Sequence, residues 1–484
     1  MSKRLIHVGV VFLALYGLLF FRLEWIQIFS AEKLKNHTDN TRQVTMAFDQ
    51  PRGEIRTADG EVIAQTVAVS GSRERLRQYP YGSMYSHLTG FISAVNGGSG
   101  IERNFNNFLS GSDLSVRIQD NRDFFIDRAR TGQVELSIRH DVQLVTRAAM
   151  AGQNGAAVII EPSSGAVLGM WSAPNFDPNY LSSHDLAAAA ADFITLRSST
   201  DQPLQNRAEF LTHELGPLFT LVTATAAIEA DLLATEAKHE LSEGSGTKAT
   251  SETATSSCIK TLSILLTKQC TNQWKALGEQ IGQSDLSSVA KRFGLTDVDP
   301  LRLEGSPIGN LSRGALDSSP AAAAIGENFA ASPLQVAHLF ATIANNGTRM
   351  QPQVVRRILA HNGDSIKEFA PKALEQSVSK ETAAILMDAL AEKTRQDSWP
   401  NVQENGPSIA GLTASRLATG DHIWSAAIAP VTQPEVVVVV LLEGDDQFNR
   451  DTADATISAI TLSLIHISEP TRLRRISYAV FCLK

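Results

Sequence analysis

The sequence predicts a mixed α/β protein of the α+β kind, in which helices cover a largely antiparallel sheet. Strand-like apolar segments occur in two pairs, near Ala156–Met170 and near Ser425–Leu442, and helical patterns fill the interval between them. A chain of 484 residues exceeds the size of one hydrophobic core, so several folded units are expected. Hydrophobic residues make up 43% and charged residues 19% of the chain, which excludes a disordered protein.

The first residues predict a membrane anchor over 1–29. Lys3 and Arg4 precede an uncharged, mostly apolar run, Leu5–Phe21, which is longer than the usual core of a signal peptide. A cleaved signal peptide, with the small residue Ser30 near the cut, is the alternative. The two cations predict a cytoplasmic N-terminus, so we expect a single-pass protein of the cell membrane with most of the chain outside the cytoplasm.

Charge and cysteine content limit the classes of ligand. The chain has 43 Lys and Arg against 51 Asp and Glu, a net charge of −8, which argues against nucleic acid as a partner. Three cysteines match no four-ligand zinc spacing, so we expect neither a metal nor a cofactor. Outside the cytoplasm, Cys258 and Cys270 can form a disulfide, and two buried free thiols are the alternative.

A small strand-rich domain is expected over 30–133. This part is polar, rich in Gly, Ser, Asn and Arg, and contains short alternating runs such as Glu61–Ala64. A larger domain is expected over 134–462, beginning where Val134–Ile138 alternates with period two and helical spacing follows over Asp141–Ala151.

Within the larger domain the elements follow in order. Two strands surround the turn Ser163–Gly165 and form a predicted hairpin, whereas Val436–Leu442 is apolar on both faces and predicts a central strand. Glu243–Ser257, rich in Gly, Ser and Thr, predicts a loop. Helices are predicted over Leu221–Ala230, Leu286–Phe293, Leu334–Asn345 and Thr382–Glu392. In the last segment, 463–484, several arginines stand beside an isolated apolar run. We treat this segment as a C-terminal extension and exclude it from the predicted fold; the alternative is a basic peripheral tail.

A series of short phrases follows in one order along the chain. The phrases are Pro51-Arg52-Gly53, Asp59-Gly60, Tyr79-Pro80, His87-Leu88-Thr89-Gly90, Gly100-Ile101-Glu102, Ser172-Ala173-Pro174, Asp177-Pro178-Asn179, Asn206-Arg207-Ala208, Pro333-Leu334-Gln335 and Asn345-Asn346-Gly347. Together they resemble the class B penicillin-binding proteins, most closely the actinobacterial penicillin-binding protein A type.

The resemblance runs from Pro51 to about Leu462 and implies an anchor, a dimerisation-like pedestal and a penicillin-recognising transpeptidase domain. Members of the family cross-link peptidoglycan stem peptides through a serine acyl-enzyme, so the resemblance implies the membrane, stem peptides and other cell-wall synthesis proteins as partners. The chemistry needs three motifs: Ser-x-x-Lys for nucleophile and base, Ser-x-Asn for proton transfer, and Lys-Thr-Gly for the substrate carboxylate.

The first motif falls on Leu215–Ala224, which places Pro217 at the nucleophile and Thr220 at the lysine. Proline has neither a hydroxyl nor a backbone N–H, and in the family that N–H supplies half of the oxyanion hole. Losing one such donor costs about 3 to 4 kcal/mol of transition-state stabilisation, and losing the nucleophile removes the acyl-enzyme route.

The other two motifs are also substituted. Gln269 and Thr271 stand where the second motif has Ser and Asn, and Leu412 stands where the third has Lys. Among the aligned positions, only Thr413 has the residue type of the family motif, the Thr of Lys-Thr-Gly, and can donate a hydrogen bond from its hydroxyl. The sequence therefore predicts no catalytic residue at these addresses.

Three hypotheses follow for function. The first is a catalytically inactive pseudo-transpeptidase that acts as a scaffold or regulator in cell-wall elongation or division. The second is an active D,D-transpeptidase with an atypical nucleophile. The third is a non-covalent sensor of muropeptides or β-lactams that uses the residual cleft.

Overall fold

The computed structural model describes residues 3–29, 50–70, 74–118, 130–233, 262–268, 270–296, 319–397, 399, 408–415, 422–444 and 450–468. The chain divides into two compact units, Met1–Pro51 with Thr66–Leu76, and the remainder. The loop predicted over Glu243–Ser257 lies outside the described residues.

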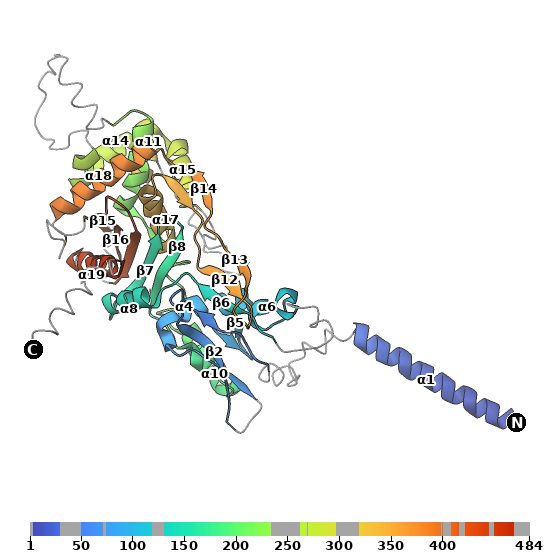
Figure 1. The fold of residues 1–484 in the computed structure, drawn as a ribbon. Helices are drawn as coiled ribbons and strands as arrows, with labels where there is room; N and C mark the ends of the chain where they lie inside the picture. Colours follow the sequence, from blue (N-terminus) through green and yellow to red (C-terminus); the bar gives the residue numbers. More distant parts are fainter. Residues whose placement is uncertain are drawn as a thin grey trace, which may run out of the picture. The chain divides into compact units, whose positions relative to one another are not determined.

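The N-terminal segment forms one long helix, α1 (Lys3–Phe29) (Figure 1). Its window His7–Trp25 has a mean hydropathy of 1.7, so its length and composition allow it to cross a membrane. Phe12 and Leu13 are 70% and 77% exposed, which in water would be unfavourable and in lipid is not.

A five-stranded antiparallel sheet forms the centre of the larger unit. Its strand order is β15 (Ala410–Ser415), β16 (His422–Ala429), β17 (Val436–Glu443), β7 (Asn154–Glu161) and β8 (Ala166–Ala173). The predicted hairpin is confirmed as β7 and β8, with Val158 opposite Met170.

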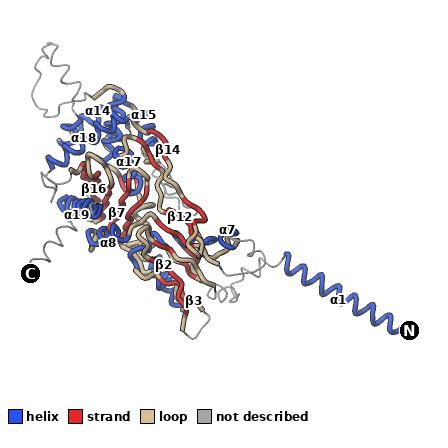
Figure 2. The backbone as a smooth tube through the Cα atoms, viewed as in Figure 1, coloured by secondary structure: helices blue, strands red, loops and turns tan. Residues whose placement is uncertain are grey.

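Helices cover this sheet. The third strand in the order, β17, is a run of valines and leucines buried along almost its whole length, as predicted for a central strand. Helices α17 (Pro333–Ala344) and α19 (Arg450–Ser468) pack against it, and α19 also contacts α8 (His140–Ala149) (Figure 2). The predicted α+β architecture is confirmed.

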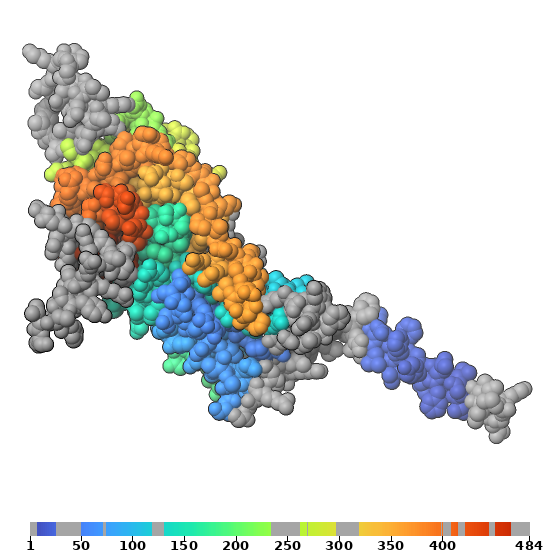
Figure 3. Space-filling model, in the orientation of Figure 1, coloured from blue at the N-terminus to red at the C-terminus, as the bar shows by residue number. Residues whose placement is uncertain are grey.

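A second sheet has the order β13 (Ser365–Glu368), β12 (Val355–Leu359), β6 (Gln133–Leu136), β1 (Ile55–Arg56), β2 (Val62–Ala68) and β3 (Arg75–Gln78). Strand β6 pairs with β1 in parallel and with β12 in antiparallel orientation, so a segment more than 200 residues later joins the sheet. In Figure 3 the orange surface of β12 and β13 borders the cyan and teal surface of the chain near β6.

A buried carboxylate connects two of the short phrases noted in the sequence, Pro51-Arg52-Gly53 and Gly100-Ile101-Glu102. Glu102 of α5 (Gly100–Asn104) is fully buried and accepts hydrogen bonds from Arg52 Nε at 2.5 Å and Arg77 Nε at 2.6 Å. Burial pushes the pKa of Glu102 up, but the two guanidinium groups outweigh burial and hold it below its ordinary value.

The remaining elements complete the chain. Helix α19 continues to Ser468 and buries Leu464 and Ile465, so the start of the excluded segment 463–484 belongs to the folded unit; residues 469–484 lie outside the described residues. The other elements are η1 (Gly82–Tyr85), α4 (Ser86–Thr89), β4 (Ile92–Ser93), β5 (Gly97–Gly98), α6 (Asn106–Leu109), α7 (Leu114–Arg117), α9 (Pro178–Leu181), α10 (Leu186–Ser198), β9 (His213–Glu214), η3 (Gly216–Phe219), α11 (Thr220–Glu229), α13 (Leu262–Thr267), α14 (Thr271–Ile281), α15 (Gln283–Arg292), α16 (Pro320–Ala324), β10 (Ala330–Ala331), β11 (Thr348–Met350), β14 (Ala373–Gln376) and α18 (Lys380–Asp397).

Candidate functional site

Residues from all three motif addresses meet at one small cavity. Its volume is about 30 Å³, which is room for a water molecule or two and far below the size of a peptide-binding site. We call it the motif cavity. It is lined by Pro217, Thr220, Leu266, Thr271, Trp274, Ile325 and Leu412.

The wall that carries Pro217 is tethered to the central sheet. The carbonyl oxygen of Glu214 accepts a hydrogen bond from the Trp424 indole N–H at 2.9 Å and lies 2.9 Å from His422 Nε2. One residue later, the Leu215 N–H donates to the Phe329 carbonyl at 2.8 Å. Pro217 then falls in the first turn of η3, where a residue without an N–H leaves no helix hydrogen bond unmade.

Thr220 lies three residues after Pro217, on the same side of the η3–α11 segment. Its hydroxyl donates a hydrogen bond of 2.6 Å to the Pro217 carbonyl oxygen, and the residue is 5% exposed. The sequence analysis aligned this pair with the nucleophile and base of the first motif, and neither residue carries an ionisable group.

The second address forms another wall. Thr271 is the first residue of α14, and Trp274, one turn later, is 2% exposed and fills space beside it. Gln269 lies outside the described residues. Cys270, at the N-cap of α14, is disulfide-bonded; its expected partner Cys258 also lies outside the described residues, so that pairing stays a prediction.

The third address is split between the two faces of β15. Leu412 is 3% exposed and lines the motif cavity. Thr413 faces the opposite way, as successive residues of a strand do, and its hydroxyl lies 2.7 Å from Ser425 Oγ and donates to the Asp454 carboxylate. The structure therefore brings together four of the six motif positions, and Thr413 does not line the cavity.

The motif cavity has no ionisable side chain in its lining. Sequence analysis missed Leu266 and Ile325, because a buried apolar residue in a helical pattern gives no signal that distinguishes a cleft wall from core.

Sequence analysis also missed Glu443, which accepts a hydrogen bond from Arg207 Nε at 2.9 Å and pairs with His213 Nε2 at 3.0 Å. Burial raises the pKa of Glu443, but hydrogen bonds from His213 and Arg207 outweigh it and hold that pKa below its ordinary value.

Comparison with known proteins identifies two matching families. The penicillin binding protein transpeptidase domain matches residues 155–462, and the penicillin binding protein A dimerisation domain matches residues 52–134. The peptidoglycan D,D-transpeptidase PbpA of Mycolicibacterium smegmatis is 32% identical, over 93% of this chain and 95% of its own. PbpA of Mycobacterium tuberculosis is 30% identical, over 96% and 98%.

Solved structures give the same result. The imipenem acyl-enzyme complex of penicillin-binding protein A from M. tuberculosis superposes with a TM-score of 0.74 at 27% identity, covering 87% of this chain and all of that one. Its penicillin G acyl-enzyme complex superposes with a TM-score of 0.71 at 27% identity, covering 86% of this chain and 100% of that one.

Proposed function

The chain belongs to the penicillin-binding protein transpeptidases of cell-wall biosynthesis, and we propose that it is a pseudo-transpeptidase. In this role it acts as a scaffold or regulator and catalyses no reaction itself. In this proposal residues 1–29 are the anchor and 30–133 the pedestal, and the transpeptidase-like domain begins at 134 and includes all of α19, to Ser468. The observation that carries the proposal is Pro217 at the nucleophile position, facing a cavity of about 30 Å³.

Three features of the motif cavity support the loss of catalysis. Pro217 can neither attack a carbonyl carbon nor donate a backbone hydrogen bond to an oxyanion. Thr220 cannot take up a proton as an amine would, and its hydroxyl is already bonded to the Pro217 carbonyl. Leu412 offers no charge to a substrate carboxylate.

The volume of the cavity supports a role that does not depend on substrate in the cleft. Trp274, Leu266 and Ile325 are each less than 5% exposed, and together with Leu412 they fill the space between the three addresses. A stem peptide would have to displace packed side chains to enter, at a cost of the kind paid for opening a core. This also argues against a sensor that uses the cleft.

The position in the cell follows from the N-terminus. Lys3 and Arg4 are the first two residues of α1, so we place the N-terminus in the cytoplasm and the two other domains outside. Proteins of cell-wall synthesis then share the same side of the membrane and are the proposed partners.

The decisive experiment is covalent labelling. Full-length protein in detergent micelles is incubated with fluorescent penicillin and its intact mass is measured, with M. smegmatis PbpA as the reactive reference. We expect the relative to gain the mass of the antibiotic and this chain to gain none while it keeps a cooperative thermal transition. A stoichiometric adduct would overturn the proposal, and peptide mapping would then locate the nucleophile.

A second experiment tests the role of binding. A strain that lacks this protein is complemented with the wild-type chain or with Thr220→Ala, and growth and cell shape are scored. Because the proposal assigns no chemistry to Thr220, both chains should restore the wild-type phenotype equally. Failure of a folded, membrane-located Thr220→Ala chain would argue for chemistry at this site.

A further inference from the structure

Helix α10 (Leu186–Ser198) exposes one apolar side of a helix that is apolar all round (Figure 1). Asp192 and Arg197 are its only charged residues. Among the residues of this described helix, however, only Ala189 is buried. Because a helix that is apolar on every side is normally enclosed in a core, the exposed side of α10 indicates that something covers it in the assembled protein.

The inner face of α10 is fixed to the domain by a small core of its own. Phe193 packs against a cluster that contains Phe91 and Leu181, and the rings of Phe91 and Phe193 lie 6.0 Å apart. The Ala189 carbonyl oxygen accepts a hydrogen bond of 3.1 Å from the side-chain amide of Asn96. These contacts hold the helix in place, so its opposite side is a firmly supported surface.

We call this opposite side the outer face of α10. Spacings of three and four residues bring its exposed members to one side of the helix. They are Ala187, Ala188, Ala191, Ile194, Thr195 and Ser198. Ile194 is 66% exposed, and none of the six carries a charge. Small side chains around one larger apolar residue allow a second helix to approach to the lower end of the usual interaxial range, roughly 8 to 10 Å.

The two ends of α10 carry opposite charges. Asp185 is the N-cap, and its carboxylate accepts a hydrogen bond of 3.0 Å from the Ala188 N–H. Arg197 lies in the last turn and is exposed. Ala191 stands midway between these two residues along the chain. A second α10 that runs antiparallel and crosses at Ala191 therefore brings each acidic end toward the basic end of the other copy.

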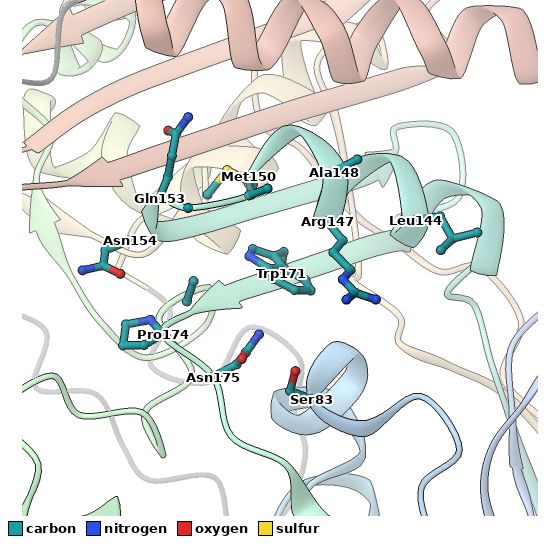
Figure 4. A pocket seen from close by; sticks show the side chains of 13 residues that line it. Ser83, Leu144, Arg147, Ala148, Met150, Gln153, Asn154, Trp171, Pro174 and Asn175 are labelled. Carbon is teal, nitrogen blue, oxygen red and sulfur yellow. The ribbon is translucent and has the colours of Figure 1, made fainter.

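A large hollow elsewhere in the domain has a different character. Its volume is about 700 Å³, and Leu144 of α8 at its margin is 45% exposed. Figure 4 shows Arg147 projecting beside Leu144 from the same helix, and the Trp171 side chain in this hollow is only 7% exposed. A cation interrupts the apolar surface there, whereas the outer face of α10 is uncharged between its ends.

We propose that the outer face of α10 binds the same face of a second copy of this chain, in antiparallel orientation and with Ala191 at the crossing point. A two-fold symmetric contact needs a surface that is complementary to itself. The outer face meets this condition, because its centre is uncharged and its two ends are opposite in charge. A partner with a charged centre would have to desolvate that charge without a counter-ion.

The position of α10 in the chain also supports a second copy as the occupant. Phe91 and Asn96, which hold the inner face, lie within residues 52–134, the part that matches the penicillin binding protein A dimerisation domain. Helix α10 itself lies outside that part, within the match to the transpeptidase domain. The proposed contact therefore borders the dimerisation domain and does not belong to it. This inference goes beyond the proposed function and does not depend on catalysis or its loss.

The first test measures association. Sedimentation velocity of the full-length protein in detergent micelles, over a range of protein concentrations, gives the dissociation constant of the dimer. Ile194→Asp brings a charge from each copy into the contact, so we expect this constant to rise at least about tenfold. Leu114→Asp, at a residue of α7 that is 67% exposed, is the matched control and should leave it unchanged. A wild-type chain that stays monomeric, or an Ile194→Asp chain that dimerises like the wild type, would overturn the proposal.

The second test locates the contact by cross-linking. In a Cys482→Ser background, Ala191→Cys should give a disulfide-linked dimer on mild oxidation, because residues at the crossing point bring their Cβ atoms within reach of a disulfide, about 3.5 to 4.5 Å. Leu114→Cys is the control and should stay monomeric on a non-reducing gel. An Ala191→Cys chain that forms no covalent dimer would contradict the crossing point.

The third test determines the orientation. Arg197→Glu places an acidic residue toward Asp185 of the other copy, so it should weaken an antiparallel dimer at low salt and less so at high salt. A tighter dimer in Arg197→Glu would overturn the antiparallel arrangement. Penicillin labelling is measured separately, so the proposed function and this interface can each fail alone.

Discussion

Thr220 Oγ1 donates a hydrogen bond of 2.6 Å to the carbonyl oxygen of Pro217, the residue that we propose stands at the nucleophile position. In a working Ser-x-x-Lys pair these two positions would carry the hydroxyl to be activated and the amine that activates it. Here the contact joins the Thr220 hydroxyl to the main chain of Pro217. It stabilises the turn between the two residues and does not prepare a hydroxyl for proton transfer.

Restoring the hydroxyl alone should therefore not restore reactivity. Pro217→Ser places a hydroxyl at the cavity, but Thr220 cannot accept its proton and Leu412 cannot hold a substrate carboxylate. We expect no penicillin adduct by intact-mass analysis of Pro217→Ser, as for the wild-type chain. An adduct that maps to residue 217 would show that a base is present outside the three addresses.

A lysine at the third motif should destabilise the protein without activating it. Leu412 is 3% exposed and the motif cavity offers no carboxylate, so Leu412→Lys places an unpaired cation among apolar side chains. We expect a loss of about 3 to 5 kcal/mol in the free energy of unfolding, measured by denaturant titration. Leu412→Met is the control and should cost less than about 1.5 kcal/mol. A stable Leu412→Lys chain would contradict the closed cavity.

Thr413 should matter for stability and not for β-lactam chemistry. Its hydroxyl bridges Ser425 and Asp454 inside the domain. Thr413→Val removes the donor and should lower the free energy of unfolding by about 1 to 3 kcal/mol, whereas Thr413→Ser should keep most of it. Equal stability of the two variants would mean that the bridge contributes nothing.

His338 should make the protein less stable in acid. Burial, together with a smaller effect of the nearby Arg349 cation, lowers the pKa of His338 to about 3, while the unfolded value is close to 6.5. As the pH falls, the unfolded chain therefore binds this proton before the folded protein does. The free energy of unfolding keeps its full value above pH 6.5 and decreases by about 1.4 kcal/mol per pH unit as the pH falls toward 3. His87, whose pKa burial lowers to about 4, acts in the same direction.

The measurement is the free energy of unfolding between pH 7 and pH 4. His338→Leu should show a slope shallower by about 1.4 kcal/mol per pH unit than that of the wild-type chain. His361→Leu, on an exposed turn, is the matched control. Identical slopes for His338→Leu and the wild-type chain would show that His338 is protonated as readily in the folded protein as in the unfolded chain.

Much of the fold could be predicted because its signals are local. The continuous apolar runs Ala156–Ile160 and Val436–Leu442 specify strands through their short length and their β-branched residues, and the structure has β7 and β17 there. Strand β12 was not predicted, because its partner β6 is more than 200 residues earlier and pairing over that separation has no sequence period.

The sequence by itself determined which chemical groups Pro217, Thr220 and Leu412 lack. A proline has no hydroxyl or N–H, a threonine no amine and a leucine no charge, in any surroundings. Only the tertiary structure decided that Pro217, Thr271 and Leu412 converge on a cavity of about 30 Å³, and that Thr413 faces away from it. The reason is physical: a residue's chemistry belongs to its own atoms, whereas a cavity's volume depends on how side chains from distant segments pack together.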